Sequence, residues 1–105
     1  MTTTTTVAGT TVDLDDEGFF TDPTQWNEDM AREMAAEEGI ELTDRHWTVV
    51  RFTRNEYLQK GTGATVRMLG KASGVPVKEL YQLFPKAPAK TAARIAGIPK
   101  PRGCI

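Results

Sequence analysis

The amino-terminal part of the chain has the pattern of β-structure. Residues 2–14 are rich in threonine and valine and break at Gly9, which predicts a short β-hairpin or a frayed pair of strands. We expect residues 1–9 to fray. A cluster of turn residues follows, and after it come Phe19 and Phe20, two large aromatic residues that we expect to fill the core.

Apolar residues recur at helical spacing through the rest of the chain, and stop signals separate the runs. The pattern predicts helices over approximately residues 25–38, 44–60, 64–73, 77–84 and 89–96. Thr43 is a clear N-cap for the second of them. In the third, we expect Val66, Met68 and Leu69 to face inward. These elements predict a mostly α fold of the α+β class, with one small helical domain over residues 1–105 and a hairpin at its start.

The third and fourth predicted helices form a helix-turn-helix pattern with Gly74 at the turn. Such a motif can dock a helix in the major groove of DNA. Lysines that could contact phosphates lie near the motif, at Lys71, Lys78, Lys86 and Lys90. The second helix offers few side chains that read bases, namely Lys78, Glu79 and Gln82. Since many small domains pack helices in this way, a DNA-binding regulator is kept only as an alternative.

Length and cysteine content restrict the class of protein. At 105 residues the chain is expected to bury one modest core, and its single cysteine excludes a disulfide within the chain. No apolar run approaches the roughly 20 residues of a membrane-spanning helix. Residues 1–6 have neither the basic nor the apolar region of an export signal. We therefore expect a cytoplasmic protein, in a reducing compartment and away from membranes.

The net charge of −1 conceals a division into an acidic and a basic part. Residues 1–44 carry twelve aspartates and glutamates and a single cation, Arg32. Residues 45–105 carry twelve lysines and arginines against two glutamates. This division predicts either a basic face for an anionic or acidic partner, or two halves that neutralise each other across their interface. The pattern leaves both readings open.

The candidate chemistry lies at the carboxyl end. Cys104 is the only cysteine, and it follows two prolines and a glycine that prevent a regular helix. We expect residues 97–105 to form a flexible, partly extended arm whose thiol can enter the cleft of another protein. Lys100 and Arg102 flank the end of the arm, and nearby cations favour the nucleophilic thiolate.

Other kinds of site find little support in the sequence. A metal site needs several cysteine, histidine or carboxylate ligands that converge, and the chain has one cysteine and one histidine. His46 lies in the first turn of a predicted helix, where we expect a structural role. Gly61-Thr62-Gly63 lacks the following glycine and lysine of a phosphate-binding loop. We therefore expect no metal and no cofactor.

The carboxyl-terminal part carries a more specific pattern. Residues 83–90 read LFPKAPAK, residues 94–101 read RIAGIPKP, and the chain ends in Gly-Cys-Ile. This pattern closely resembles the carboxyl end of the TusE/DsrC sulfur-relay family, which is also labelled the sulfite reductase gamma subunit family. The resemblance extends over residues 10–105, through segments at Asp16-Glu17-Gly18-Phe19, Trp26, Leu42-Thr43, His46-Trp47, Val50-Arg51-Phe52 and Arg67-Met68-Leu69.

The resemblance implies a sulfur carrier with a helical body and a mobile arm. Cys104 would accept sulfane sulfur as a persulfide from a donor sulfurtransferase and pass it to an acceptor protein, as in the relay for tRNA 2-thiouridine formation. Lys100, Arg102 and Arg94 would hold anionic sulfur species or guide the arm. Members coupled to dissimilatory sulfite reductase carry a second arm cysteine where this chain has Ala93. The resemblance therefore favours the single-cysteine, TusE-like role.

Two alternatives accompany this reading. A gamma-type subunit associated with sulfite reductase is the alternative within the family, and a helix-turn-helix regulator is the alternative outside it. The connection over residues 71–80 is shorter than in the family's usual pattern, which leaves the identity of donor and acceptor open. We expect a transferase-like carrier with protein partners rather than a self-contained enzyme or a nucleic-acid binder.

Overall fold

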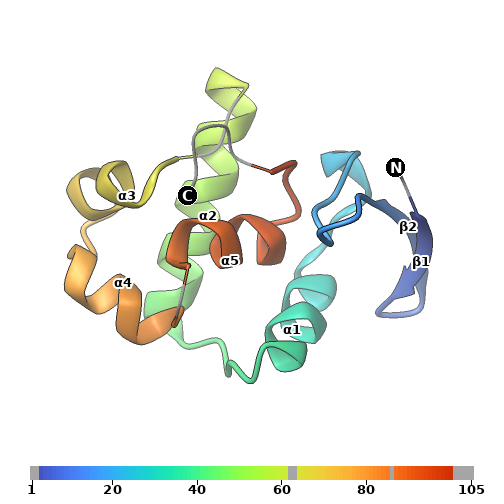
Figure 1. The fold of residues 1–105 in the computed structure, drawn as a ribbon, viewed down its shortest axis with the longest axis horizontal. Helices are drawn as coiled ribbons and strands as arrows, with labels where there is room; N and C mark the ends of the chain where they lie inside the picture. The colour runs from blue at the N-terminus through green and yellow to red at the C-terminus, as the bar shows by residue number, and fades with distance from the viewer. Residues whose placement is uncertain (1–2, 62–63, 86, 101–105) are drawn as a thin grey trace.

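The computed structural model describes residues 3–61, 64–85 and 87–100. Within these ranges a two-stranded sheet is followed by a short 3-10 helix and then by α-helices (Figure 1). Their bounds are β1 Thr3–Val7, β2 Thr10–Leu14, η1 Pro23–Gln25, α1 Glu28–Glu37, α2 Asp44–Lys60, α3 Val66–Ala72, α4 Val77–Leu83 and α5 Pro88–Ile95. The order confirms the predicted mostly helical α+β class. None of the helices in the described ranges is both long and apolar enough to cross a membrane.

Strands β1 and β2 form the predicted hairpin and pair antiparallel along their whole lengths. The turn consists of Ala8 and Gly9, whose φ angles of +50° and +79° suit the two-residue turns that match strand twist. Val12 is fully buried and joins the hairpin to the core. Residues 3–7 are thus paired within the segment expected to fray, and fraying itself stays a prediction.

The first helix begins later than the sequence pattern predicts. A start near Gln25 was wrong, because η1 occupies that position and α1 begins only at Glu28. Asn27 is the N-cap, and its side-chain oxygen accepts a hydrogen bond of 3.0 Å from the backbone N–H of Met30. The helix buries one stripe of side chains, made of Met30, Ala31, Met34 and Ala35.

Helix α2 begins at the predicted N-cap, Thr43, and His46 takes part in its capping box. The backbone N–H of Thr43 donates to Nδ1 of His46 at 3.1 Å, and Nε2 donates to the carbonyl oxygen of Leu83 at 2.9 Å. Both ring nitrogens are therefore used within the fold, and the imidazole lies buried. The predicted structural role of His46 is confirmed.

Helices α3 and α4 form the predicted helix-turn-helix, with Gly74 at φ +84° in the turn. The two helices meet so closely that a β-carbon on Gly70 would overlap the side chain of Val77. Leu69 is fully buried, as predicted, but the inward orientation expected for Met68 was wrong, because its side chain is exposed. On α3, Leu69 faces the core and Gly70 faces α4, so the side chain of Met68 is left on the solvent side.

Helix α5 packs against α1, α2, α3 and α4, and it lies across the front of α2 in Figure 1. Its buried side chains are Pro88, Ala89, Thr91, Ala92, Ala93 and Ile95. These are mostly small, which lets the helix lie close to its neighbours. Phe19 and Phe20 are buried, as predicted.

Candidate functional site

The segment that leads from α5 toward Cys104 is fixed to the body of the protein by packing. We call residues 93–100 the base of the arm. Gly97 has a φ of +70°, and a β-carbon there would overlap the side chain of Trp26. The indole Nε1 of Trp26 donates to the carbonyl oxygen of Ile95 at 2.7 Å. Trp26 therefore holds the end of α5 by both contact and hydrogen bonding.

Arg54 of α2 binds the same turn. Its guanidinium donates to the carbonyl oxygen of Ala96 at 2.9 Å and to that of Pro23 at 2.8 Å. The guanidinium carbon also lies 4.3 Å from the centroid of the Trp26 ring, within the range of a cation–π contact. Burial lowers the pKa of Arg54 from its ordinary value. A cation at the carboxyl end of α5 is favourable because the last carbonyl groups carry partial negative charge.

A second, smaller hydrophobic cluster covers the base of the arm. It contains Phe19, Ala93 and Ile98, and Tyr57 packs against it. Ile98 is fully buried, and its N–H donates to the carbonyl oxygen of Ala93 at 3.2 Å. Gly97 and Ile98, the first residues of the predicted flexible arm, are packed into the body, and the flexibility of residues 97–105 stays a prediction.

Two of the predicted binding residues lie on this side of the molecule, each in an ion pair with the acidic part of the chain. Nζ of Lys100 lies 2.7 Å from a carboxylate oxygen of Glu17, and Arg94 pairs with Glu38. Arg94 also lies against Gly18, where a β-carbon would come within 3.1 Å of Nε of the arginine. Arg102 and Cys104 lie outside the described residues.

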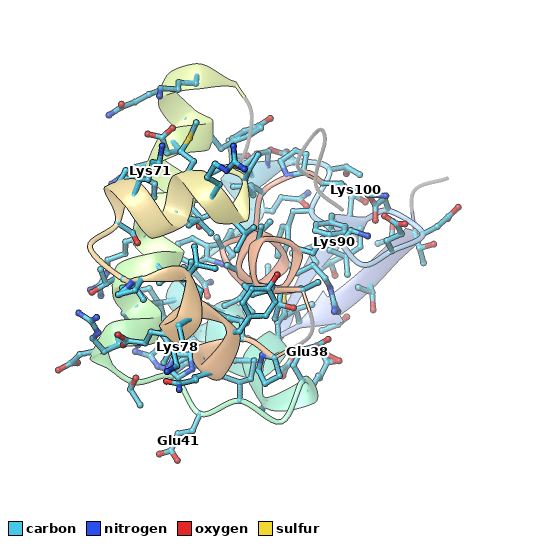
Figure 2. The ribbon with its side chains drawn as sticks, turned by 60° about the vertical axis from the view of Figure 1, so that its left-hand side comes forward. Glu38, Glu41, Lys71, Lys78, Lys90 and Lys100 are labelled. Atoms are coloured by element: carbon cyan, nitrogen blue, oxygen red, sulfur yellow. The ribbon has the colours of Figure 1, made fainter. Side chains whose placement is uncertain are left out.

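A cavity of about 280 Å³ opens beside these ion pairs. It is lined by Glu17, Phe19, Glu38, Pro85, Ala87, Lys90, Thr91 and Arg94. In the view of Figure 2, Lys90 and Lys100 lie on one side of the molecule, and Lys71 and Lys78 lie on the other. The cavity combines charged side chains with the apolar Phe19, Pro85 and Ala87, so its lining is suited to a group that has both an apolar and a polar part.

The ion pairs also bear on the charge division of the chain. Arg94–Glu38, Lys100–Glu17 and Arg51–Glu28 each join the basic part to the acidic part. Neutralisation across the interface therefore accounts for part of the division. In the ranges that the structure describes, no three cysteine, histidine or carboxylate side chains come together as a metal site would require.

Sequence reasoning missed Arg54, Trp26 and Glu17 as parts of this site. In the sequence, Trp26 was noted only as part of the family resemblance, and Arg54 was not singled out. Their contacts with Ile95 and Ala96 join segments that are far apart in the sequence, so no local pattern could indicate them. The one signal that could have indicated Arg54 is its place in the helix, since it follows the buried Thr53 of α2.

A family model described as DsrC like protein matches residues 6–105 of the chain. The chain belongs to this DsrC family. Curated relatives include the sulfurtransferase TusE of Salmonella typhimurium, which is 48% identical over 104 residues covering 92% of this chain and 95% of that protein. TusE of Escherichia coli is 45% identical with the same coverage. The resemblance predicted from the sequence is confirmed.

Solved structures of DsrC proteins have the same fold. The NMR structure of Allochromatium vinosum DsrC has a TM-score of 0.83 and 37% identity, and the match covers 100% of both chains. The oxidized gamma subunit of the dissimilatory sulfite reductase from Archaeoglobus fulgidus has a TM-score of 0.82 and 36% identity, covering 98% of this chain and 100% of that one. At these identities the similarity supports the family as well as the fold.

Proposed function

We propose that the protein is a sulfur carrier in which Cys104 accepts sulfane sulfur from a donor protein and passes it to an acceptor protein. The observation that carries this proposal is the match to sulfurtransferases named TusE over most of the chain, together with a family match that reaches the end of the chain, where the only cysteine lies. A lone thiol near a chain end can form a persulfide without being consumed by a disulfide within its own chain.

The transfer needs no outside oxidant or reductant. The thiolate of Cys104 attacks the outer sulfur of a persulfide on the donor cysteine. A new S–S bond forms to Cys104, the S–S bond of the donor breaks, and the electron pair of that bond leaves with the donor sulfur as a thiolate. Delivery to the acceptor repeats the same exchange with Cys104 as the leaving sulfur.

The anchored base of the arm limits how far the thiol of Cys104 can reach. Ile98 is the last fully buried residue in the described ranges. Five residues lie between it and Cys104, and the six residue steps from Ile98 to Cys104 span at most about 20 Å. A partner cysteine must therefore come within about that distance of Ile98.

The ion pairs at the base refine the roles proposed for Lys100 and Arg94. Each cation is held by a carboxylate, Lys100 by Glu17 and Arg94 by Glu38. In the proposed function, an anionic sulfur species replaces Glu17 or Glu38 as the partner of the cation that binds it. Arg102 is proposed to help at the end of the arm, because its charge favours the thiolate.

The TusE-like role is preferred to a gamma-type subunit because Ala93 stands where the second arm cysteine is expected, and an alanine cannot form a disulfide. The gamma subunit from Archaeoglobus fulgidus keeps that alternative open, since its structure is similar to this one. We propose the tRNA thiolation relay as the pathway and the cytoplasm as the compartment, where thiols stay reduced.

Intact mass spectrometry tests the proposal. After incubation with a persulfide-bearing sulfurtransferase, a fraction of the protein should gain about 32 Da, the mass of one sulfur atom. The Cys104→Ser variant should gain nothing, and reduction with a thiol should remove the added mass from the wild-type protein. A gain that persists in Cys104→Ser would refute the assignment of the carrier thiol.

A further inference from the structure

Most of the large hydrophobic side chains that stay exposed lie on two helices that pack against each other, α3 and α4. Within the described ranges they are Leu58, Met68, Val77 and Tyr81, with exposed fractions of 60%, 39%, 39% and 49%. Three of them lie on α3 and α4, and Leu58 lies near the end of α2. Exposed apolar side chains that gather in this way are typical of a surface that binds a partner.

Basic side chains lie among these apolar residues. Arg67 and Lys71 on α3 and Lys78 on α4 are exposed, and the structure shows no ion pair for any of the three. The acidic residue on these helices, Glu79, is already held by Arg45 through two hydrogen bonds of 2.7 Å. These three cations can therefore pair with acidic side chains of a partner, whereas Arg94 and Lys100 at the base of the arm are already paired with carboxylates of this chain.

These residues belong to one surface. Val77 and Tyr81 are one turn apart on α4, and Val77 lies directly against Gly70 of α3, next to Lys71. Figure 2 shows Lys71 and Lys78 on the side of the molecule formed by α3 and α4. We call this surface the α3–α4 face, made of Arg67, Met68, Lys71, Val77, Lys78 and Tyr81.

The composition of the face favours a protein over a nucleic acid. Tyrosine, methionine and arginine are enriched at the centres of protein interfaces, where they fill apolar pockets. A surface that binds DNA is more polar, and it reads bases through side chains such as Arg, Lys, Asn and Gln with few apolar residues among them. On the exposed side of α4 the polar groups are Lys78 and Gln82, beside the apolar Val77 and Tyr81.

We propose that the α3–α4 face docks the donor protein that delivers sulfur to Cys104, and that the donor presents acidic side chains around an apolar patch. This inference rests on the proposed function. Helix α5 packs against both α3 and α4 and leads directly into Ile98. A donor seated on the α3–α4 face is therefore held in a fixed relation to the base of the arm, and the residues beyond it have only to reach the donor cysteine.

The test compares two ways of loading Cys104. The protein probe is the donor purified from the source cells by its ability to add about 32 Da to this chain. The small-molecule probe is inorganic polysulfide, which needs no docking surface. The variants are Lys71→Gln with Lys78→Gln, and separately Tyr81→Ser. The matched control, Thr6→Glu with Thr10→Glu, makes the same change in net charge on exposed positions of the hairpin, at the opposite end of the molecule in Figure 1.

We expect the lysine variant and Tyr81→Ser each to slow loading by the donor protein at least about tenfold, as removal of a central interface residue does. Loading by polysulfide should stay at the wild-type rate in every variant. Raising the salt concentration from about 50 to about 500 mM should slow the wild-type protein and have little effect on the lysine variant, because exposed charges are screened.

Three results would overturn the inference. Donor loading at the wild-type rate in both variants would show that the face is not used. Equal slowing with polysulfide would place the effect at the thiol instead of at a docking surface. Tight binding of duplex DNA or tRNA that is lost in the lysine variant would assign the face to nucleic acid. If no donor protein loads Cys104 at all, the proposed function fails, independently of the face.

Discussion

Gly97 offers the sharpest test of how the base of the arm is held. Changing Gly97 to alanine adds one carbon at a position with two separate obstacles. The φ of +70° is left-handed, and an alanine there costs about 1–2 kcal/mol. The new carbon also overlaps Trp26, and overpacking of this kind costs about 1–3 kcal/mol. We expect Gly97→Ala to lower the free energy of unfolding by about 2–5 kcal/mol.

Gly39 provides a matched control. It has a φ of +74°, and no atom lies within 4 Å of where its β-carbon would be. Gly39→Ala therefore measures the cost of the left-handed backbone alone. The difference between the two variants isolates the overlap with Trp26. A second check is the Trp26→Ala background, in which Gly97→Ala should lose its extra cost and equal Gly39→Ala.

The assay is urea denaturation followed by circular dichroism, with thermal melting in support. For a domain of this size each kcal/mol shifts the melting temperature by about 4–8 °C. If Gly97→Ala and Gly39→Ala destabilise the protein equally, the packing of Gly97 against Trp26 does not fix the base of the arm, and this reasoning is wrong.

Two further predictions concern a buried position and an ion pair. A cysteine introduced by Ala93→Cys should react with a thiol reagent far more slowly than Cys104, because Ala93 is fully buried. Mass spectrometry of the labelled peptides measures the two rates. Equal rates would contradict the packing of Ala93 under Ile98. Arg45 lowers the pKa of Glu79, so the stabilisation from their pair is present at neutral pH and fades as the pH falls through the ordinary glutamate range toward the lowered pKa. Glu79→Gln should therefore reduce the melting temperature at pH 7 and have no effect near pH 2, whereas equal effects at both values would contradict this assignment.

The sequence predicted those parts of the fold that local patterns determine. The helices follow from apolar periodicity, and the N-cap at Thr43 follows from the preference of a hydroxyl for that position. The start of α1 was misplaced because Asn27 and the residues around Pro23 are both good helix starts, and only packing selects between them. Met68 was misassigned because the spacing of apolar residues on α3 does not show on which side α4 lies.

The candidate site was predictable to a smaller extent. The lone thiol and its neighbouring cations are visible in the sequence, and the resemblance to the family follows from the motifs around them. The partners of Lys100 and Arg94 were not predictable, because Glu17 and Glu38 lie more than fifty positions away in the sequence. The early anchoring at Ile98 depends on Phe19 and Tyr57 and was missed for the same reason.

The position of Arg54 has a consequence for how the protein opens. One side chain in the middle of the chain binds carbonyl groups at Pro23 and at Ala96. Chain ends usually exchange their amide hydrogens through local fraying at little cost in free energy. Here the carbonyl groups of Ile95 and Ala96 accept hydrogen bonds from side chains of two distant segments. The amides of residues 96–98 donate to carbonyl groups of α5, which these contacts hold in place, so their exchange should require the whole domain to unfold. A slowly exchanging core would then extend to within a few residues of the segment that carries Cys104.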